Sequence, residues 1–226
     1  MTTESLTPTT SDDVLAASSS DPTRRWFLVA AGAVGAAAVA AACGNDNEPS
    51  GGSTSAGSST STTASAAADG EVAKVAAGLE VLAVQTYTAA AAAAGSGKLG
   101  AIPPAVGEFV KTALGHHQEH LAAWNKVITA GGGTAVTAPN AKLKPTVDAE
   151  FAKVTDAAGA AKLALMLEQI AAQTYLKVLP TLGSKDAIKL AASIQAVDQE
   201  HQAILLFALG QYPVPDVFQK TEKAAV

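Results

Sequence analysis

Two long, mostly apolar segments of this chain repeat the same pattern of polar residues. The first contains Leu79-Glu80 and then Gln85-Thr86-Tyr87, and the second contains Leu167-Glu168 and then Gln173-Thr174-Tyr175 at the same spacing. Each is followed by a segment with the tripeptide Gln-Glu-His, at 118–120 and 199–201. A repeat in the same order indicates that one helical hairpin occurs twice and that the two copies pack with approximate two-fold symmetry.

Four predicted helices carry these repeats. They span about residues 71–94, 104–130, 155–179 and 185–209. A Pro-Pro pair marks the start of the second helix. Each helix is followed by residues that end helices, which are in chain order Gly-Ser-Gly, three glycines, Pro180 and Gly210. Short links within each pair predict antiparallel neighbours, and the link 131–154, with a helical turn near 147–154, is long enough to cross a bundle. We therefore expect an all-α fold, an antiparallel four-helix bundle with a long crossover.

The composition agrees with a helical fold and limits the kinds of binding partner to expect. Of the 226 residues, 48% are hydrophobic and 15% are charged, and alanine, the strongest helix former, is abundant. The net charge of −5 and the lack of a basic patch in the sequence give no reason to expect a nucleic-acid partner. Cys43 is the single cysteine, so the chain has neither an internal disulfide nor a Cys-x-x-Cys motif.

Each apolar repeat contains one acidic residue where a bundle helix is expected to be buried. Glu80 is the only charged residue within 75–97, and Glu168 is equally isolated in the second repeat. Tyr87 and Tyr175 follow seven residues later, about two helical turns, so each shares a face with its glutamate. A tyrosine hydroxyl usually satisfies a lone buried glutamate, but two glutamates at equivalent positions favour a functional role.

Three of the four histidines lie together in the second predicted helix. His117 and His120 are three positions apart and share a face, and Asp198 and His201 occupy the equivalent positions in the fourth helix. A carboxylate from each of two helices, with an acid-x-x-His pair from each of the other two, is the ligand set of di-iron and di-manganese bundles. Imidazole and carboxylate groups also suit zinc. The candidate metal ligands are Glu80, His117, His120, Glu168, Asp198 and His201.

Other polar residues near this centre have alternative roles. His116 is four positions before His120 and could replace His117 as the ligand. Glu119 and Glu200 lie about 100° around their helices from the histidines, which predicts supporting or surface positions. The candidates for support beside the ligands are Tyr87, Tyr175, His116, Glu119 and Glu200. A bundle without metal, holding a buried polar network, is the alternative for the whole set.

The N-terminal residues resemble an export signal. Arg24 and Arg25 precede Trp-Phe-Leu and an apolar run that ends before Cys43, as in a twin-arginine signal, which exports folded proteins. The end of the run resembles a lipobox with Cys43 as the lipidated residue, although the usual Leu of a lipobox and a Lys after Phe-Leu are absent. An uncleaved membrane anchor over residues 26–42 is the alternative, and its 17 residues are few for a span.

These features divide the chain into three parts. Residues 1–42 are expected to be the signal peptide. Residues 43–70 are expected to be a flexible linker after the lipidated cysteine, because Ser, Thr, Gly and Ala dominate them. Residues 71–226 are expected to hold the four-helix domain and a C-terminal tail. The domain would then lie outside the cytoplasm, anchored by lipid to the outer face of the membrane.

The ligand pattern resembles the ferritin-like superfamily, close in type to exported ferritin-like domain proteins of bacteria. The resemblance covers about residues 71–212 and implies a four-helix bundle with a long crossover and a metal centre at mid-bundle. Glu80 and Glu168 match the single glutamates of the family, and His120 and His201 match its histidines.

Two positions depart from that family. Where the family has Glu three residues before each His, this chain has His117 and Asp198. The predicted set of three carboxylates and three imidazoles is therefore less anionic. Such a site is compatible with one metal ion in place of two, or with zinc in place of iron.

The resemblance implies oxidation of ferrous iron, or reduction of peroxide or oxygen, at a centre of iron or manganese. We therefore expect an exported, lipid-anchored protein that binds one or two transition-metal ions. A metal-free bundle that acts as a non-catalytic binding or envelope module is the alternative, and fold alone does not separate the two. The lipid tether suits a monomer or small homo-oligomer better than a storage cage, and the sequence has no Cys ligands for an attached iron–sulfur domain.

Overall fold

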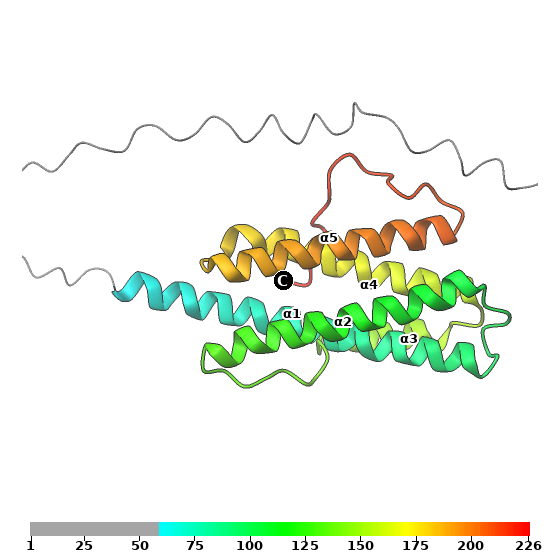
Figure 1. The fold of residues 1–226 in the computed structure, drawn as a ribbon, viewed down its shortest axis with the longest axis horizontal. Coiled ribbons are helices and arrows are strands. Elements are labelled where there is room, and N and C mark those ends of the chain that lie inside the picture. The colour runs from blue at the N-terminus through cyan, green and yellow to red at the C-terminus, as the bar shows by residue number, and fades with distance from the viewer. Residues whose placement is uncertain (1–58) are drawn as a thin grey trace, which may run out of the picture. The chain divides into compact units, whose positions relative to one another are not determined.

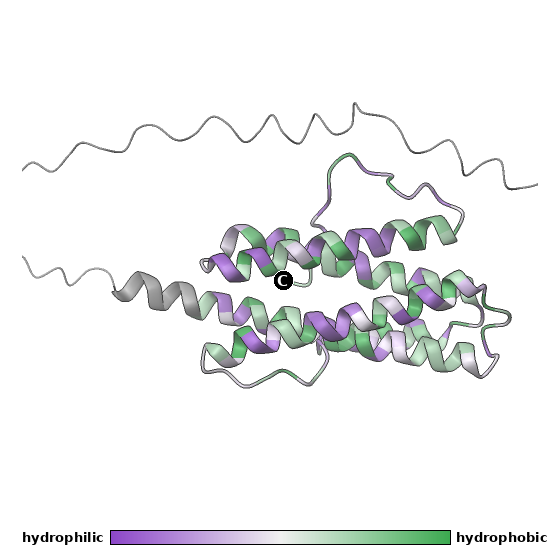
Figure 2. Cartoon of the chain, in the orientation of Figure 1, coloured by the Kyte–Doolittle hydropathy of each residue, from purple (hydrophilic) through white to green (hydrophobic). Residues whose placement is uncertain are grey.

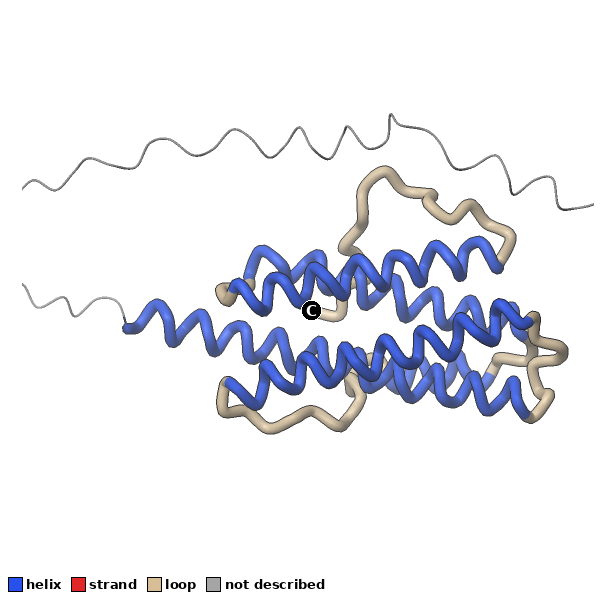
Figure 3. Tube along the Cα trace, viewed as in Figure 1, coloured by secondary structure: helices blue, strands red, loops and turns tan. Residues whose placement is uncertain are grey.

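The computed structural model describes residues 59–226. Within this range the chain consists of helices and connecting loops and contains no strand (Figure 3). The predicted export signal with Arg24 and Arg25, and the predicted lipidation site at Cys43, lie outside the described residues. The helical elements are α1 (Ser59–Gly95), α2 (Pro104–Ala130), α3 (Lys144–Ala152), α4 (Ala157–Val178), the 3-10 turn η2 (Leu179–Thr181) and α5 (Lys185–Ala208).

Four long helices form two antiparallel hairpins (Figure 1). α1 packs along α2, and α4 packs along α5. The hairpins meet where α1 contacts α4 and α2 contacts α5, and the short helix α3 lies in the crossover between them. The expected all-α, antiparallel four-helix bundle with a long crossover is therefore confirmed.

The first helix begins earlier than the sequence pattern predicts. α1 starts at Ser59, not at about residue 71, so the last part of the predicted linker is helical. Alanine is frequent in this part, and alanine favours helix even where no apolar periodicity is visible. Asp69 then secures it, because its buried carboxylate accepts hydrogen bonds of 2.8 and 2.7 Å from the backbone N–H groups of Gly183 and Ser184. α1 is thereby tied to the loop before α5.

Local signals in the sequence determine the ends of the other long helices. The carboxylate of Asp156 accepts a 2.7 Å hydrogen bond from the N–H of Gly159 in the first turn of α4. The hydroxyl oxygen of Ser184 accepts one of 3.4 Å from the N–H of Ala187 at the start of α5. These side chains satisfy donors that a helix start leaves without partners. After α2, Gly132 adopts a φ of +79°, which glycine allows at little energetic penalty.

The crossover runs close against the first hairpin. Asn125 of α2 holds it at Val136, donating to the carbonyl at 3.0 Å and accepting from the N–H at 2.7 Å. The N–H of Asn140 donates a 2.8 Å hydrogen bond to the carbonyl of Gly78 within α1. A Cβ atom at residue 78 would lie 3.4 Å from the nitrogen of Asn140, an ordinary van der Waals contact, so the crossover packs directly on α1 at this point. α3 follows and overlaps the helical turn predicted near 147–154.

Apolar side chains fill the bundle on either side of its middle. Hydrophilic stretches interrupt the apolar ones along α2 and α5 (Figure 2). One buried cluster includes Trp124, Ile128, Tyr175 and Ile194 with alanines of α1, and another includes Leu82, Leu99, Val147, Leu163 and Leu167. The Ala67–Gly95 part of α1 is long and apolar enough to cross a membrane. Half of its apolar stretch is buried inside the bundle, however, as in the core helix of a globular domain.

Candidate metal centre

Two glutamates lie buried in the middle of the bundle. Glu80 of α1 and Glu168 of α4 are each 1% exposed, although their helices are apolar around them. They occupy the equivalent positions of the two sequence repeats. A carboxylate in this environment requires hydrogen-bond partners or a cation, because burial without them is strongly unfavourable.

His117 of α2 lies between the two glutamates. Its Nδ1 is 2.8 Å from Oε2 of Glu80, and its Nε2 is 3.1 Å from Oε1 of Glu168. The imidazole is almost fully buried and lies against the ring of Tyr87, with 5.3 Å between the ring centroids. Between the two alternatives that the sequence left open, the structure therefore brings His117 and not His116 between the glutamates.

Each glutamate also has a histidine from its own hairpin. Nδ1 of His120 is 3.7 Å from Oε2 of Glu80, and Nδ1 of His201 is 3.3 Å from Oε2 of Glu168. The two contacts are equivalent under the repeat. His116 makes a different contact across the hairpins, since its Nδ1 is 3.0 Å from Nε2 of His201 and the two rings are stacked. His116 therefore supports His201 from the outer side.

The tyrosines of the repeat connect the two hairpins. The hydroxyl of Tyr87 donates a 2.5 Å hydrogen bond to Oε1 of Glu168, and the hydroxyl of Tyr175 donates one of 2.5 Å to Oε1 of Glu80. Each tyrosine is directed toward the centre, as its spacing from a glutamate predicted. The partner, however, is the glutamate of the other repeat, because the two hairpins pack face to face.

Trp124 is a supporting residue that the sequence patterns did not reveal. Its Nε1 donates a 2.9 Å hydrogen bond to the hydroxyl of Tyr175, and the two rings are stacked with centroids 6.0 Å apart. It is fully buried. The sequence feature that could have identified Trp124 is its position four residues after His120, on the same face of α2. Trp124, Tyr175 and Glu80 form a hydrogen-bonded series in which each member holds the next in place.

Asp198 of α5 is buried beside this network without a partner. It is fully buried, and neither carboxylate oxygen has a hydrogen-bond partner among the described residues. Nδ1 of His120 is likewise buried without a hydrogen bond. Native interiors rarely leave such groups unsatisfied. A bound cation is a direct way to satisfy a buried carboxylate oxygen or imidazole nitrogen.

The charges of the cluster depend on one another. Burial opposes a charge on His117, but the charges and hydrogen bonds of Glu168 and Glu80 outweigh burial and raise the pKa of His117 well above 6.5. Burial alone would raise the pKa of Glu80, yet His117 and His120 hold it at about 2. Burial, followed by the charges of Glu168 and Glu80, raises the pKa of Asp198 well above 3.8. The centre therefore disfavours a third negative charge unless further positive charge is bound.

The remaining candidates lie farther out. Glu119 and Glu200 are exposed, and within the described chain they make no hydrogen bond or ion pair with the buried cluster. Of the supporting and surface positions that the sequence allowed for these two glutamates, the structure shows the surface position. The contacts across the four helices join five of the six candidate ligands, the two tyrosines and His116, whereas Asp198 is buried beside them and belongs to neither group of close donor atoms.

The donor atoms of the cluster suit a metal ion. Two groups have ligand atoms all within 4.8 Å of one another, Glu80 with His117 and His120, and His117 with Glu168 and His201. His117 belongs to both groups. Imidazole nitrogen and carboxylate oxygen form the usual donor set for iron, manganese and zinc. The residues therefore form a possible buried His/Glu metal site.

The fold and this donor set define a class, the helical bundles that carry carboxylate and histidine ligands at mid-bundle. Residues 68–211 match the sequence model of the family described as the ferritin-like domain. The chain belongs to this family, which confirms the resemblance seen in its repeats. No curated protein and no solved structure matches the chain.

Proposed function

We propose that the protein binds one or two divalent transition-metal ions at the buried cluster, with iron or manganese as the expected metals and zinc as the alternative. The observation that carries the proposal is Asp198, a fully buried carboxylate with no hydrogen-bond partner in the described chain. Nδ1 of His120, which belongs to the Glu80 donor group, has no hydrogen bond either. Bound cations would balance the charge of Glu80 and Glu168 and would lower the penalty for a charge on Asp198, whose pKa responds to both glutamates.

The residues form two groups of donor atoms that share His117, and each group would hold one ion; both groups would bind at once only if both ring nitrogens of His117 lost their protons. Nδ1 of His117 is directed toward Glu80, whose group also includes His120. Nε2 is directed toward Glu168, whose group also includes His201. Asp198 adds a third carboxylate for the cluster. One ion would use either group, and two ions would require both.

Bound iron or manganese would supply one-electron chemistry, and ferrous iron, peroxide or oxygen are the substrates that this chemistry suits. The residues of the chain orient the ligands and exclude water. Tyr87 and Tyr175 each hold a carboxylate oxygen by a 2.5 Å hydrogen bond. Burial raises the pKa of both tyrosines well above 10, so their hydroxyls remain protonated donors. Trp124 and His116 in turn hold Tyr175 and His201.

Metal analysis of the purified chain tests this function directly. After reconstitution with iron, manganese or zinc, we expect about one or two ions per chain by elemental analysis. Glu80→Gln and Glu168→Gln should abolish binding, because each removes an anionic ligand. Glu119→Gln and Glu200→Gln are matched controls, since both residues are exposed and lie next to histidines of the cluster. Bound metal far below one ion per chain, or equal loss in the controls, would refute the proposal.

The proposal extends to location. The Arg24-Arg25 signal and the lipobox-like sequence before Cys43 support export of the folded domain and its anchoring by lipid at the outer face of the membrane. Replacing both arginines by lysine should retain the protein in the cytoplasm. Cys43→Ala should preserve export but release the protein from the membrane fraction. Membrane attachment that survives Cys43→Ala would support the uncleaved anchor instead.

A metal-free envelope or binding module is a second candidate, and one observation favours it. Protonated His117 contacts both glutamates, so a single imidazolium already compensates part of their charge. Both tyrosines add hydrogen bonds to the same carboxylates. In this alternative the cluster only holds the hairpins together, and the metal analysis above distinguishes the two functions.

A further inference from the structure

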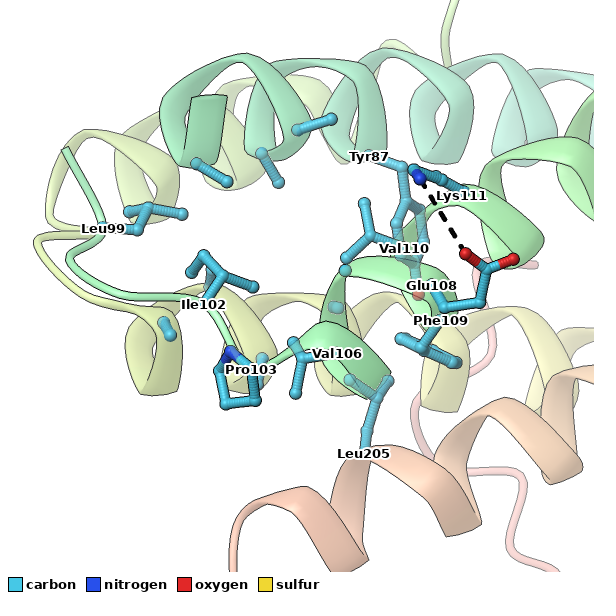
Figure 4. A pocket seen from close by; sticks show the side chains of 18 of the residues that line it. Tyr87, Leu99, Ile102, Pro103, Val106, Glu108, Phe109, Val110, Lys111 and Leu205 are labelled. Atoms are coloured by element: carbon cyan, nitrogen blue, oxygen red, sulfur yellow. Dashed lines mark ion pairs between the residues drawn. The ribbon is translucent and has the colours of Figure 1, made fainter. Parts of the chain in front are cut away.

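A cavity of about 550 Å³ opens at the end of the bundle where α1 ends and α2 begins. Its lining comes from α1, the loop before α2, the first turns of α2, and α4, with Phe151 of α3 and Leu205 of α5; Figure 4 shows most of these side chains. Leu99, Ile102, Val106 and Phe109 are among the larger lining side chains. The volume lies within the range of small-molecule sites, and such sites are mostly apolar.

The cavity exists because the helices on its two sides present small residues. Ala90 and Ala94 line it from α1, and Ala160 and Ala164 line it from α4. In contrast, the buried cluster around Trp124 contains the large side chains of Ile128, Tyr175 and Ile194. Small side chains on both helices therefore contribute to the open space.

The polar groups at the inner end are already paired. The hydroxyl of Tyr87 donates to Glu168, and the hydroxyl of Thr86 donates to the carbonyl of Leu82 at 2.8 Å. Phe109 completes this wall, with its ring 6.3 Å from the ring of Tyr87. The inner end thus offers aromatic and aliphatic surface, which would recognise hydrocarbon and not a polar group.

Charged residues occur only at the rim of this lining. Glu108 and Lys111 are exposed and form an ion pair of 3.8 Å, marked in Figure 4. A ligand with a polar head would keep that head in water near this pair while its chain enters the cavity. An entirely polar ligand would gain nothing from the lining.

We propose that this cavity binds a single-chain aliphatic molecule, such as a fatty acid or a long-chain alcohol, with its hydrocarbon end against Tyr87 and Phe109. The proposal goes beyond metal binding and does not require it, because none of the candidate metal ligands lines the cavity. Phe109 also lies edge-on to His201, with ring centroids 5.7 Å apart. Only the ring of Phe109 would therefore separate the end of the bound hydrocarbon from this histidine of the metal cluster.

The test measures binding of a fluorescent probe, cis-parinaric acid, to the full-length protein in metal-free form. Ala90→Phe and Ala161→Phe fill the cavity from its two sides. Ala92→Phe and Ala158→Phe are the matched controls, since they make the same change at exposed positions of the same helices outside the lining. Circular dichroism and thermal melting verify that all four variants fold.

We expect saturable binding of one probe per chain and displacement by decanoate and by decanol. The cavity-filling variants should weaken binding about tenfold or more, and the controls should leave it unchanged. Absence of saturable binding to the unmodified protein, or equal weakening in the controls, would overturn the proposal.

A further pair of variants excludes a surface site. Phe207 and Phe218 are 75% and 84% exposed and provide another apolar place for the probe. In one outcome, the double variant Phe207→Ser/Phe218→Ser loses probe binding and the cavity-filling variants keep it. The probe then binds at this surface, and the proposal is wrong. Because every measurement uses metal-free protein, the result is independent of whether the buried cluster binds metal.

Discussion

Tyr175 of α4 donates a 2.5 Å hydrogen bond to Oε1 of Glu80 of α1, across the interface between the two hairpins. The repeat provides the same contact in reverse, from Tyr87 to Glu168. This exchange of partners joins the hairpins by two buried hydrogen bonds to carboxylates. Buried hydrogen bonds to charged acceptors contribute more to stability than those between neutral groups.

The two tyrosines should contribute unequally to stability. Tyr175→Phe leaves an oxygen of Glu80 and the Nε1 of Trp124 without a partner, whereas Tyr87→Phe affects only Glu168. We expect the free energy of unfolding of the metal-free protein to fall by about 3 kcal/mol for Tyr175→Phe and by about 2 kcal/mol for Tyr87→Phe. Urea denaturation measures both. Equal losses would contradict the supporting role of Trp124.

Asp198→Asn should have opposite effects on stability and on metal affinity. The pKa of Asp198 is raised by burial and then by Glu168 and Glu80, so above pH 3.8 its charge destabilises the folded state relative to the unfolded chain. Removing the charge should therefore stabilise the metal-free protein near neutral pH. The gain should shrink as the pH falls toward 3.8.

The same variant should weaken metal binding about tenfold or more, since it removes an anionic group from the cluster. Titration with the metal and urea denaturation of the metal-free protein measure the two effects separately. A loss of stability together with unchanged metal affinity would show that Asp198 serves only the fold.

The stability of the metal-free protein should fall as the pH rises above the ordinary range of histidine. The carboxylates raise the pKa of His117 well above 6.5, so its contribution is fully present below pH 6.5 and is lost as the pH rises through the folded-state pKa. Thermal melting of the metal-free protein at increasing pH should show this decline. In His117→Gln, the part of the decline that depends on this imidazole should disappear.

Metal binding should have the opposite dependence on pH. An imidazole nitrogen must lose its proton before it binds a metal, so affinity should increase with pH and protons should be released on binding. Calorimetric titrations in two buffers that differ in ionisation enthalpy measure the released protons. Binding without proton release would exclude His117 as a ligand.

Asp69 should be needed for the stability of the bundle. Asp69→Ala removes two hydrogen bonds to the N–H groups of Gly183 and Ser184 and leaves these donors without their carboxylate. We expect a loss of about 2 kcal/mol or more in the free energy of unfolding. Glu71→Ala is the control, because the exposed ion pair of Glu71 with Lys74 contributes about 0–1 kcal/mol. Similar losses in both variants would contradict the anchoring of α1 by Asp69.

Helix periodicity and the repeat were sufficient to predict much of the fold. Spacings of three, four and seven residues identify which side chains share a face of a helix. They predicted that Glu80, Glu168, His117 and Asp198 point inward, and Gly and Pro signals located most helix ends. The start of α1 was not predictable in this way, because Asp69 has its partners in the loop before α5, more than a hundred positions away in the sequence.

The sequence by itself therefore determined the helices, their two-fold repeat and the faces that carry acids and histidines, because these depend on the regular geometry of a single helix. Tertiary structure alone decided that Tyr175 pairs with Glu80, that His117 contacts both glutamates, and that alanines on two helices leave a cavity. Each of these depends on the rotation and register of one helix against another. Packing of the whole core determines that rotation and register, and no local spacing in the chain encodes them.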